Sequence, residues 1–179
     1  GKMLKFQLIY GENGYKITKD LRKKLFADEL GYQEFTDHLE ADSWHIVGYE
    51  EIRQMGVGRM TEIDDETFKV SYVALDKDYR RQYVGDLVMR ALADKAERLG
   101  AKFMTVDAPV SLKAFFEFEN YEVCGEEFIK NNEPHIPMKK TESTPSGNMK
   151  FLLSFIRHTA ISQNSLSRRR PVPERKTSD

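Results

Sequence analysis

The chain has 179 residues, of which 40% are hydrophobic and 32% are charged. This length suits a single domain of roughly 100–200 residues that folds without metals, and the one cysteine excludes an internal disulfide. A mean hydropathy of −0.61, with no apolar run of roughly 18 residues, excludes a transmembrane helix. The apolar stretch 6–10 is too short for a secretory signal, so we expect a cytoplasmic protein that does not bind membranes.

The net charge of −1 is the average of two unlike parts of the chain. Residues 141–179 hold seven basic and three acidic side chains, a net charge of +4, which leaves −5 for residues 1–140. The change coincides with Thr-Glu-Ser-Thr-Pro-Ser-Gly at 141–147, a composition typical of a linker. We therefore place the folded domain at 3–140, and its acidic charge argues against nucleic-acid binding.

The appendage at 141–179 continues after the linker with an apolar cluster at 148–161 and ends with a basic stretch around 168–170. The apolar cluster suits a short helix that packs on the domain, on a partner or on a second subunit, so a monomer and a homodimer both stay open. The basic end is typical of a flexible tail.

The first elements of the domain are a strand and a helix. Residues 4–10 alternate between apolar and polar, which predicts a strand. Apolar residues then recur at helical spacing, with Thr18 suited to cap the start of a helix and Gly31 to end it. This pattern predicts a helix over 18–30. The polar segment 31–43 suits a loop or a second short helix.

Three strands follow in the prediction. β-Branched and aromatic residues favour strands over 44–49 and 54–61, joined by a turn at 50–53. The side chains of residues 68–75 alternate between two faces, which predicts a third strand. The alternation puts four of its residues on one face: Phe68, Val70, Tyr72 and Ala74.

The rest of the domain contains the clearest helix, at 85–99, with one apolar stripe and a closing glycine. A short apolar strand at 102–107, a helix at 111–119 and closing strands at 121–129 and 135–140 come after it. A strand–helix–strand crossover is right-handed and makes its two strands parallel. The fold class is therefore α/β, with a mixed sheet rather than a doubly wound one.

The turn at 79–86 has the composition of an anion site. A helix start presents unpaired backbone N–H groups at the positive end of the helix dipole, where phosphates bind. Arg80 and Arg81 add charged donors, and Gly85 lets a ligand approach the backbone. The same residues also suit a solvated basic turn before an ordinary helix.

This turn resembles the acetyl-CoA-binding motif of the GCN5-related N-acetyltransferase (GNAT) superfamily. The segment 73–75 stands where that family has its fourth strand, and 107–121 is similar to the family's fifth strand and the helix after it. Two further blocks, at 22–45 and 125–138, resemble a small bacterial subgroup described as ElaA-like or YjcF-like. The four blocks stand in the family's order over residues 3–140.

The resemblance implies a GNAT fold, in which helices flank a mostly antiparallel sheet and a splayed parallel strand pair opens a cleft at a bulge. It also implies an N-acetyltransferase that transfers the acetyl group of acetyl-CoA directly to a primary amine of a small molecule or peptide. The residues it assigns to acetyl-CoA are Val73, Ala74, Leu75, Arg80, Arg81, Gln82, Tyr83, Val84, Gly85, Asp86, Phe115 and Phe116.

Several residues depart from the family's pattern. Tyr83 replaces the first motif glycine, and Pro109 stands where the family usually has Asn or Gln. Phe116 stands where many members have the Tyr that protonates the leaving thiolate, and Phe has no proton to give. The alternative function is therefore an acetyl-CoA-binding regulatory or interaction protein with weakened or lost catalysis. Tyr121 is near in sequence, but the motif does not place it. Asn120 replaces the glycine that ends the helix, and Asn tolerates the left-handed conformation needed there.

Candidate acid–base residues also come from the resemblance. His135 and His45 match histidines of the subgroup, and His titrates near neutral pH. Glu29 follows helix residues expected to face the acceptor, and Arg22 shares its helical face, where it would pair with Glu29 or hold a substrate carboxylate. The alternatives are a strand histidine bonded to a loop and a solvated helix face. No His/Cys spacing fits a metal site, so we expect none.

Overall fold

The computed structural model describes residues 1–142, so the helix expected at 148–161 and the basic end lie outside the described residues. Short 3₁₀ turns occur at Glu40–Asp42, Lys77–Tyr79 and Val110–Leu112, and a π-helix at Lys23–Glu29. The other elements are β1 (Leu4–Tyr10), α1 (Glu12–Arg22), β2 (Ser43–Glu50), β3 (Arg53–Asp64), β4 (Thr67–Leu75), α2 (Val84–Arg98), β5 (Phe103–Pro109), α3 (Lys113–Phe118), β6 (Glu122–Val123), β7 (Phe128–Lys130) and β8 (Glu133–Thr141).

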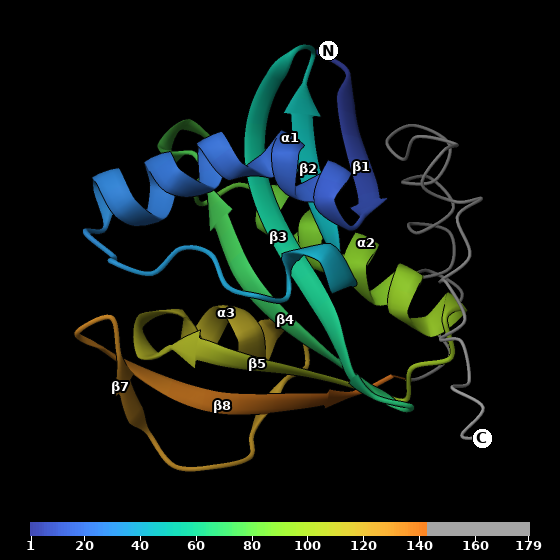
Figure 1. Ribbon diagram of the computed structural model, residues 1–179, viewed down its shortest axis with the longest axis vertical. Helices are drawn as coiled ribbons and strands as arrows, with labels where there is room; N and C mark the ends of the chain where they lie inside the picture. Colours follow the sequence, from blue (N-terminus) through green and yellow to red (C-terminus); the bar gives the residue numbers. More distant parts are fainter. Residues whose placement is uncertain (143–179) are drawn as a thin grey trace, which may run out of the picture.

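One sheet contains all the strands, in the order β1-β2-β3-β4-β5-β8-β6, with β7 also paired to β8 (Figure 1). β4 and β5 are parallel, whereas the other pairs are antiparallel. Helix α2 makes the crossover between the parallel strands, as the sequence predicts. The mixed, mostly antiparallel sheet flanked by helices is therefore confirmed.

The helices cover opposite faces of the sheet (Figure 1). Helix α2 packs its apolar stripe on the main core, where Val88 and Leu92 are fully buried. Phe116 of α3 joins the same core. On the other face, Leu21 of α1 and Leu25 of the π-helix form a smaller cluster with Val57.

The parallel pair separates halfway along β4. Its ladder with β5 runs from Thr67 to Val70 and stops there. β4 stays paired with β3, but the register shifts between Val57 and Arg59, and Tyr72 adopts a φ of 51°. This is the bulge that the resemblance implies, and it leaves backbone groups of the second half of β4 outside the parallel ladder.

The bulge also reverses the faces predicted for β4. Phe68 and Val70 lie in the main core, but Val73 packs against that core as well. Ala74 packs instead on the smaller cluster on the opposite face, and Tyr72 contacts Phe26 of the π-helix. The prediction of Tyr72 and Ala74 on one face with Phe68 is wrong because one extra residue in the strand inverts the alternation.

The first helix begins earlier than predicted. It starts at Glu12, and the Thr18 hydroxyl donates to the Gly14 carbonyl at 3.0 Å from inside the helix instead of capping it. Gly14 is required by close packing, since a Cβ there would lie 2.3 Å from the Ile9 carbonyl oxygen. The predicted C-terminal end is confirmed, because Gly31 has a φ of 72°.

The closing strand predicted at 121–129 is two short strands, β6 and β7. Pro137 lies opposite this interruption and has no N–H to donate to a neighbouring strand. Gly125 packs on the Pro137 ring, which a Cβ at that position would meet at 2.6 Å. The helix predicted at 111–119 is a 3₁₀ turn followed by α3, and Asn120 ends it with the expected positive φ, 69°.

A buried charge network fastens the loop 31–42 to the sheet. Arg59 of β3 binds both carboxylate oxygens of Asp37, at 2.6 and 2.8 Å, and Glu40 at 2.8 Å. Arg22 of α1 binds the other oxygen of Glu40 and is fully buried. Burial alone would raise the pKa of Asp37, but the hydrogen bonds from Arg59 outweigh it and lower this pKa to about 2.

Arg59→Ala should destabilise the fold by about 3–5 kcal/mol, because it leaves Glu40 buried with one fewer cation. Urea unfolding of the variant and the wild type measures this difference. Arg53→Ala is the matched control on the same strand, since the half-exposed Arg53 pairs with Asp78 at the surface and with Asp76, which keeps Lys24 as a second cation. Equal midpoints for the wild type and Arg59→Ala would show that the network does not hold the fold.

Candidate functional site

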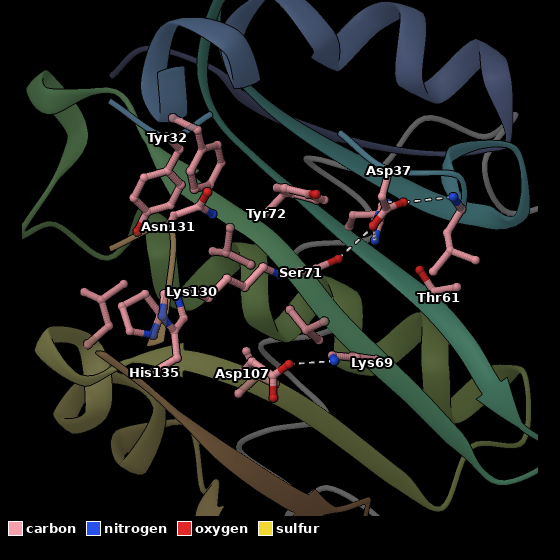
Figure 2. Close-up of a pocket in the computed structure, with 18 of the residues that line it drawn as sticks. Tyr32, Asp37, Thr61, Lys69, Ser71, Tyr72, Asp107, Lys130, Asn131 and His135 are labelled. Atoms are coloured by element: carbon pink, nitrogen blue, oxygen red, sulfur yellow. Dashed lines mark hydrogen bonds and ion pairs between the residues drawn. The ribbon is translucent and has the colours of Figure 1, made fainter. Parts of the chain in front are cut away.

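Two adjoining pockets occupy the place where β4 leaves β5. The α2-side pocket, of about 520 Å³, lies between the π-helix, the end of β4 and the turn before α2. The His135 pocket, of about 170 Å³, lies between β4, β5 and the loop that contains Asp37 (Figure 2). Five residues line both pockets and are called the junction here: Phe26, Tyr32, Val73, Pro109 and Leu112.

The α2-side pocket gathers most of the residues that the resemblance assigns to acetyl-CoA. These are Val73, Ala74, Leu75, Arg80, Arg81, Gln82, Gly85 and Phe115. Phe116 instead lines the His135 pocket. The other three do not line the α2-side pocket: Tyr83 is 62% exposed, Val84 is buried in the core, and Asp86 points to Arg90.

The turn before α2 has the features of an anion site. Among residues 1–142, no side chain makes a capping hydrogen bond at the N-terminus of this helix, which favours an anion as partner for its first N–H groups. Arg81 adopts a φ of 61°, and the Nε of Arg80 donates to the Leu75 carbonyl at 2.9 Å, which draws this side chain toward the pocket. Dipole, backbone donors and two guanidinium groups thus combine at one end of the α2-side pocket.

Gly85 has a packing role at this end. A Cβ there would lie 3.2 Å from the Phe115 ring and 3.4 Å from Leu75. The missing side chain therefore lets α3 come close to the start of α2, with Phe115 forming part of the wall of the α2-side pocket.

A pair of carboxyl groups lies behind the start of α2. Asp86 accepts two hydrogen bonds from the Nε of Arg90, at 2.9 and 2.8 Å, and is hydrogen-bonded to Glu119. Burial, and then the hydrogen bond and charge of Asp86, raise the pKa of Glu119 to about 9. Glu119 therefore keeps its proton at neutral pH, as expected for two carboxyl groups in one buried site.

His135 stands at the start of β8, where it lines the pocket named after it. Its Nδ1 lies 2.8 Å from the carbonyl oxygen of Glu133, and its ring stacks on Phe128. A carbonyl only accepts, so Nδ1 carries the proton and donates it, which leaves the lone pair of the neutral ring on Nε2. The contact thus fixes the tautomer of the imidazole ring.

The remaining polar lining of the His135 pocket is mostly paired. Lys69 and Asp107 form an ion pair of 2.6 Å between β4 and β5 (Figure 2), and Arg59 binds Asp37. The guanidinium groups of Arg22 and Arg59 both contact the Tyr72 ring, 4.3 and 4.8 Å from its centroid. Burial raises the pKa of Tyr72 to about 12, so it is a neutral hydroxyl at physiological pH.

Two other predicted acid–base residues lie outside both pockets. His45 is 1% exposed, and its Nε2 donates to the Glu40 carbonyl at 2.9 Å while its Nδ1 faces Arg22. Burial lowers the pKa of His45 to about 4. Glu29 pairs with Arg80 at 2.9 Å on the rim of the α2-side pocket. The expected pair of Arg22 with Glu29 is wrong, because Arg22 faces inward to Glu40.

Phe116 lines the His135 pocket at the position where the resemblance expects a hydroxyl. Tyr121 does not replace it. Its ring packs edge-on against Phe116, 5.6 Å between centroids, and its hydroxyl is buried without a partner among the described residues. Burial raises the pKa of Tyr121 far above its ordinary range.

One contact across the cleft, between Tyr32 and Glu133, was not predicted from the sequence. The Tyr32 hydroxyl, just after the π-helix, donates to a carboxylate oxygen of Glu133 at the start of β8. Burial, and then this carboxylate, raise the pKa of Tyr32. Ser111 lies 3.5 Å from the other oxygen of Glu133. The available signal was weak, since Tyr32 stood in the polar segment 31–43 and Glu133 between two predicted strands, 101 residues away.

Residues 1–142 contain no group of three or more His, Cys, Asp and Glu side chains arranged to hold a metal ion. Over the same part of the chain, every helix is too short or too polar to cross a membrane.

Comparison with known proteins agrees with this geometry. The model of the acetyltransferase (GNAT) domain family matches residues 10–142. The uncharacterized N-acetyltransferase YjcF of Bacillus subtilis is 31% identical over 123 residues, which cover 67% of this chain and 87% of YjcF.

Solved structures share the fold at lower identity. A putative N-acetyltransferase from Lactobacillus plantarum superposes with a TM-score of 0.73 at 19% identity, covering 79% of this chain and 99% of that one. Escherichia coli ElaA gives 0.69 at 19% identity, covering 77% and 99%. A GNAT family acetyltransferase from Elizabethkingia anophelis, solved with acetyl-CoA bound, gives 0.58 at 13%, covering 76% and 97%.

The splayed parallel pair, the bulged fourth strand and the uncapped helix start thus define an acetyltransferase fold. The chain belongs to the GNAT acetyltransferase family. Its relationship to YjcF and its structural similarity to ElaA confirm the subgroup that the sequence resembles.

Glu119→Gln should stabilise the protein increasingly as pH rises. An ordinary glutamate has a pKa of roughly 4.3, so between that pH and about 9 the folded chain retains a proton that the unfolded chain releases, and stability falls with pH. Glutamine removes this loss, which grows by about 1.4 kcal/mol for each pH unit in that window.

Thermal melts at pH 5 and pH 9 measure the effect. The gain from Glu119→Gln should be larger at pH 9 than at pH 5. Glu117→Gln, at an exposed position of α3 that pairs with Lys113, is the matched control. A gain that is the same at both pH values would contradict the buried proton.

Proposed function

We propose that the protein is an N-acetyltransferase that transfers the acetyl group of acetyl-CoA directly to a primary amine of a small molecule or peptide. The observation that carries this proposal is the pair of adjoining pockets, one ending at an uncapped helix N-terminus and the other lined by a histidine with its tautomer fixed. A site with two arms that meet holds two substrates in line, which lowers the entropic barrier of a bimolecular step.

Acetyl-CoA would occupy the α2-side pocket. Its pyrophosphate would lie on the backbone of residues 81–86, with Arg80 and Arg81 nearby, because this end concentrates positive charge. Its pantetheine arm would follow the second half of β4, where the backbone of Val73 and Leu75 is free of the parallel ladder. The GNAT structure from Elizabethkingia anophelis with acetyl-CoA bound supports this choice of ligand.

The amine would enter the His135 pocket and attack the thioester at the junction. His135 would take the amine's proton through Nε2, since Nδ1 is committed to the Glu133 carbonyl. His45, by contrast, is enclosed in the charge network, and Glu29 sits on the rim with Arg80. We therefore propose positioning roles for these two residues.

The leaving thiolate has no proton donor at Phe116, which favours a second candidate function. The protein would then bind acetyl-CoA without turning it over and act as a regulatory or interaction protein. Pro109 also favours this second function, because it lines the junction and has no N–H to donate.

Release of CoA thiol from acetyl-CoA, followed with a thiol reagent in the presence of a broad panel of amines, separates these two functions. We expect turnover with at least one amine and saturable acetyl-CoA binding by calorimetry. Binding without turnover on any amine would support the second candidate, and absence of binding would contradict both.

His135→Gln should lower kcat by about 100- to 10,000-fold, the range typical of a lost general base, with little change in acetyl-CoA affinity. Steady-state kinetics on the best amine, with calorimetry for the cofactor, gives both quantities. His38→Gln, an exposed histidine in the loop before β2, is the matched control. Unchanged kcat in His135→Gln would remove His135 from the mechanism.

A further inference from the structure

One of the five junction residues, Tyr32, belongs to neither a helix nor a strand. Val73 belongs to β4, Pro109 to β5, Leu112 to a 3₁₀ turn and Phe26 to the π-helix. Tyr32 follows the π-helix after Gly31, whose φ of 72° turns the chain back toward the cleft. Its backbone N–H donates to the Phe26 carbonyl at 2.8 Å, and the two rings lie 5.7 Å apart.

The hydrogen bond to Glu133 fixes the far end of the Tyr32 side chain. Glu133 lies at the start of β8, on the other side of the α2-side pocket, and it lines that pocket itself. The tyrosine is therefore held at its backbone from one side of the cleft and at its hydroxyl from the other. In Figure 2 it stands at the same end of the His135 pocket as Asn131.

The proposed function puts the acyl group of the donor beside this position. If the proposed function is correct, the thioester reaches the His135 pocket from the α2-side pocket, so the acyl chain must lie at the junction. Pro109 and Phe116 stand in place of polar residues of the family and make this part of the cleft apolar. An acyl chain therefore fits there, and the available space sets the length of chain that is accepted.

We infer that Tyr32, held by Glu133, restricts the donor to acyl-CoA molecules with short acyl groups. The inference rests on the proposed function for the orientation of the donor. Removing the ring enlarges the space that the two pockets share at the junction, and a longer acyl chain then finds room. Each methylene that fits or fails to fit an apolar pocket changes discrimination by about 10- to 200-fold.

The test compares acetyl-, propionyl-, butyryl- and hexanoyl-CoA as donors for the wild type and for Tyr32→Ala. The wild type should favour acetyl-CoA, and Tyr32→Ala should raise the butyryl-to-acetyl ratio of kcat/KM by at least about tenfold. Tyr32→Phe keeps the ring but loses the hydrogen bond, so its ratio should lie between the two. Glu133→Gln keeps an acceptor oxygen and should stay close to the wild type.

Phe35→Ala is the matched control, because it truncates another half-buried aromatic ring of the same loop that lines neither pocket. Its donor ratio should equal that of the wild type. A wild type that uses butyryl-CoA as well as acetyl-CoA, or a Tyr32→Ala variant with an unchanged ratio, overturns the inference.

Calorimetric affinities for acetyl-CoA and butyryl-CoA separate this inference from the proposed function. If no amine is acetylated, the proposed function fails, and the affinity ratio still decides on Tyr32. A relative gain for butyryl-CoA in Tyr32→Ala supports the inference, and an unchanged affinity ratio overturns it.

Discussion

The separation of β4 from β5 after Val70 is the constraint on which the site depends. A continued parallel ladder would use the backbone groups of Val73 and Leu75 and would close the space that both pockets occupy. The bulge at Tyr72 prevents this, because the extra residue turns β4 away while β3 stays paired to it. The cleft is thus a consequence of strand geometry rather than of a loop.

A non-glycine residue with positive φ is costly, so the bulge needs support from its surroundings. The guanidinium groups of Arg22 and Arg59 both lie against the Tyr72 ring, and Glu40 and Asp37 neutralise and orient these arginines. The same network fastens the loop that forms one wall of the His135 pocket. Fold stability and site geometry therefore share the same buried charges.

Much of this arrangement could be predicted from the sequence. Helix α2 and the strands beside it have strong local signals, namely an apolar stripe, a closing glycine and runs of β-branched and aromatic residues. The adjacent arginines of the turn before α2 suited an anion site and a solvated turn alike. The family resemblance added the bulge and the residues of the α2-side pocket. The early start of α1 escaped prediction because Gly14, which weakens a helical pattern, is required there by packing on Ile9.

The parts of the site that were not predicted depend on contacts between distant segments, which a single sequence does not show. Arg22 looked like a solvated helix residue, yet it is fully buried against Glu40. His45 matched a candidate catalytic position, but the same network encloses it and lowers its pKa to about 4. Tyr32 and Glu133 meet only because the π-helix and β8 face each other across the junction.

A crystal structure with acetyl-CoA tests the central claim most directly, because it shows where the cofactor lies relative to the separated strands. We expect the pyrophosphate on the backbone of residues 81–86, the pantetheine along Val73–Leu75, and the thioester at the junction beside Tyr32, facing the His135 pocket. A cofactor bound elsewhere, or a thioester turned away from His135, would contradict it.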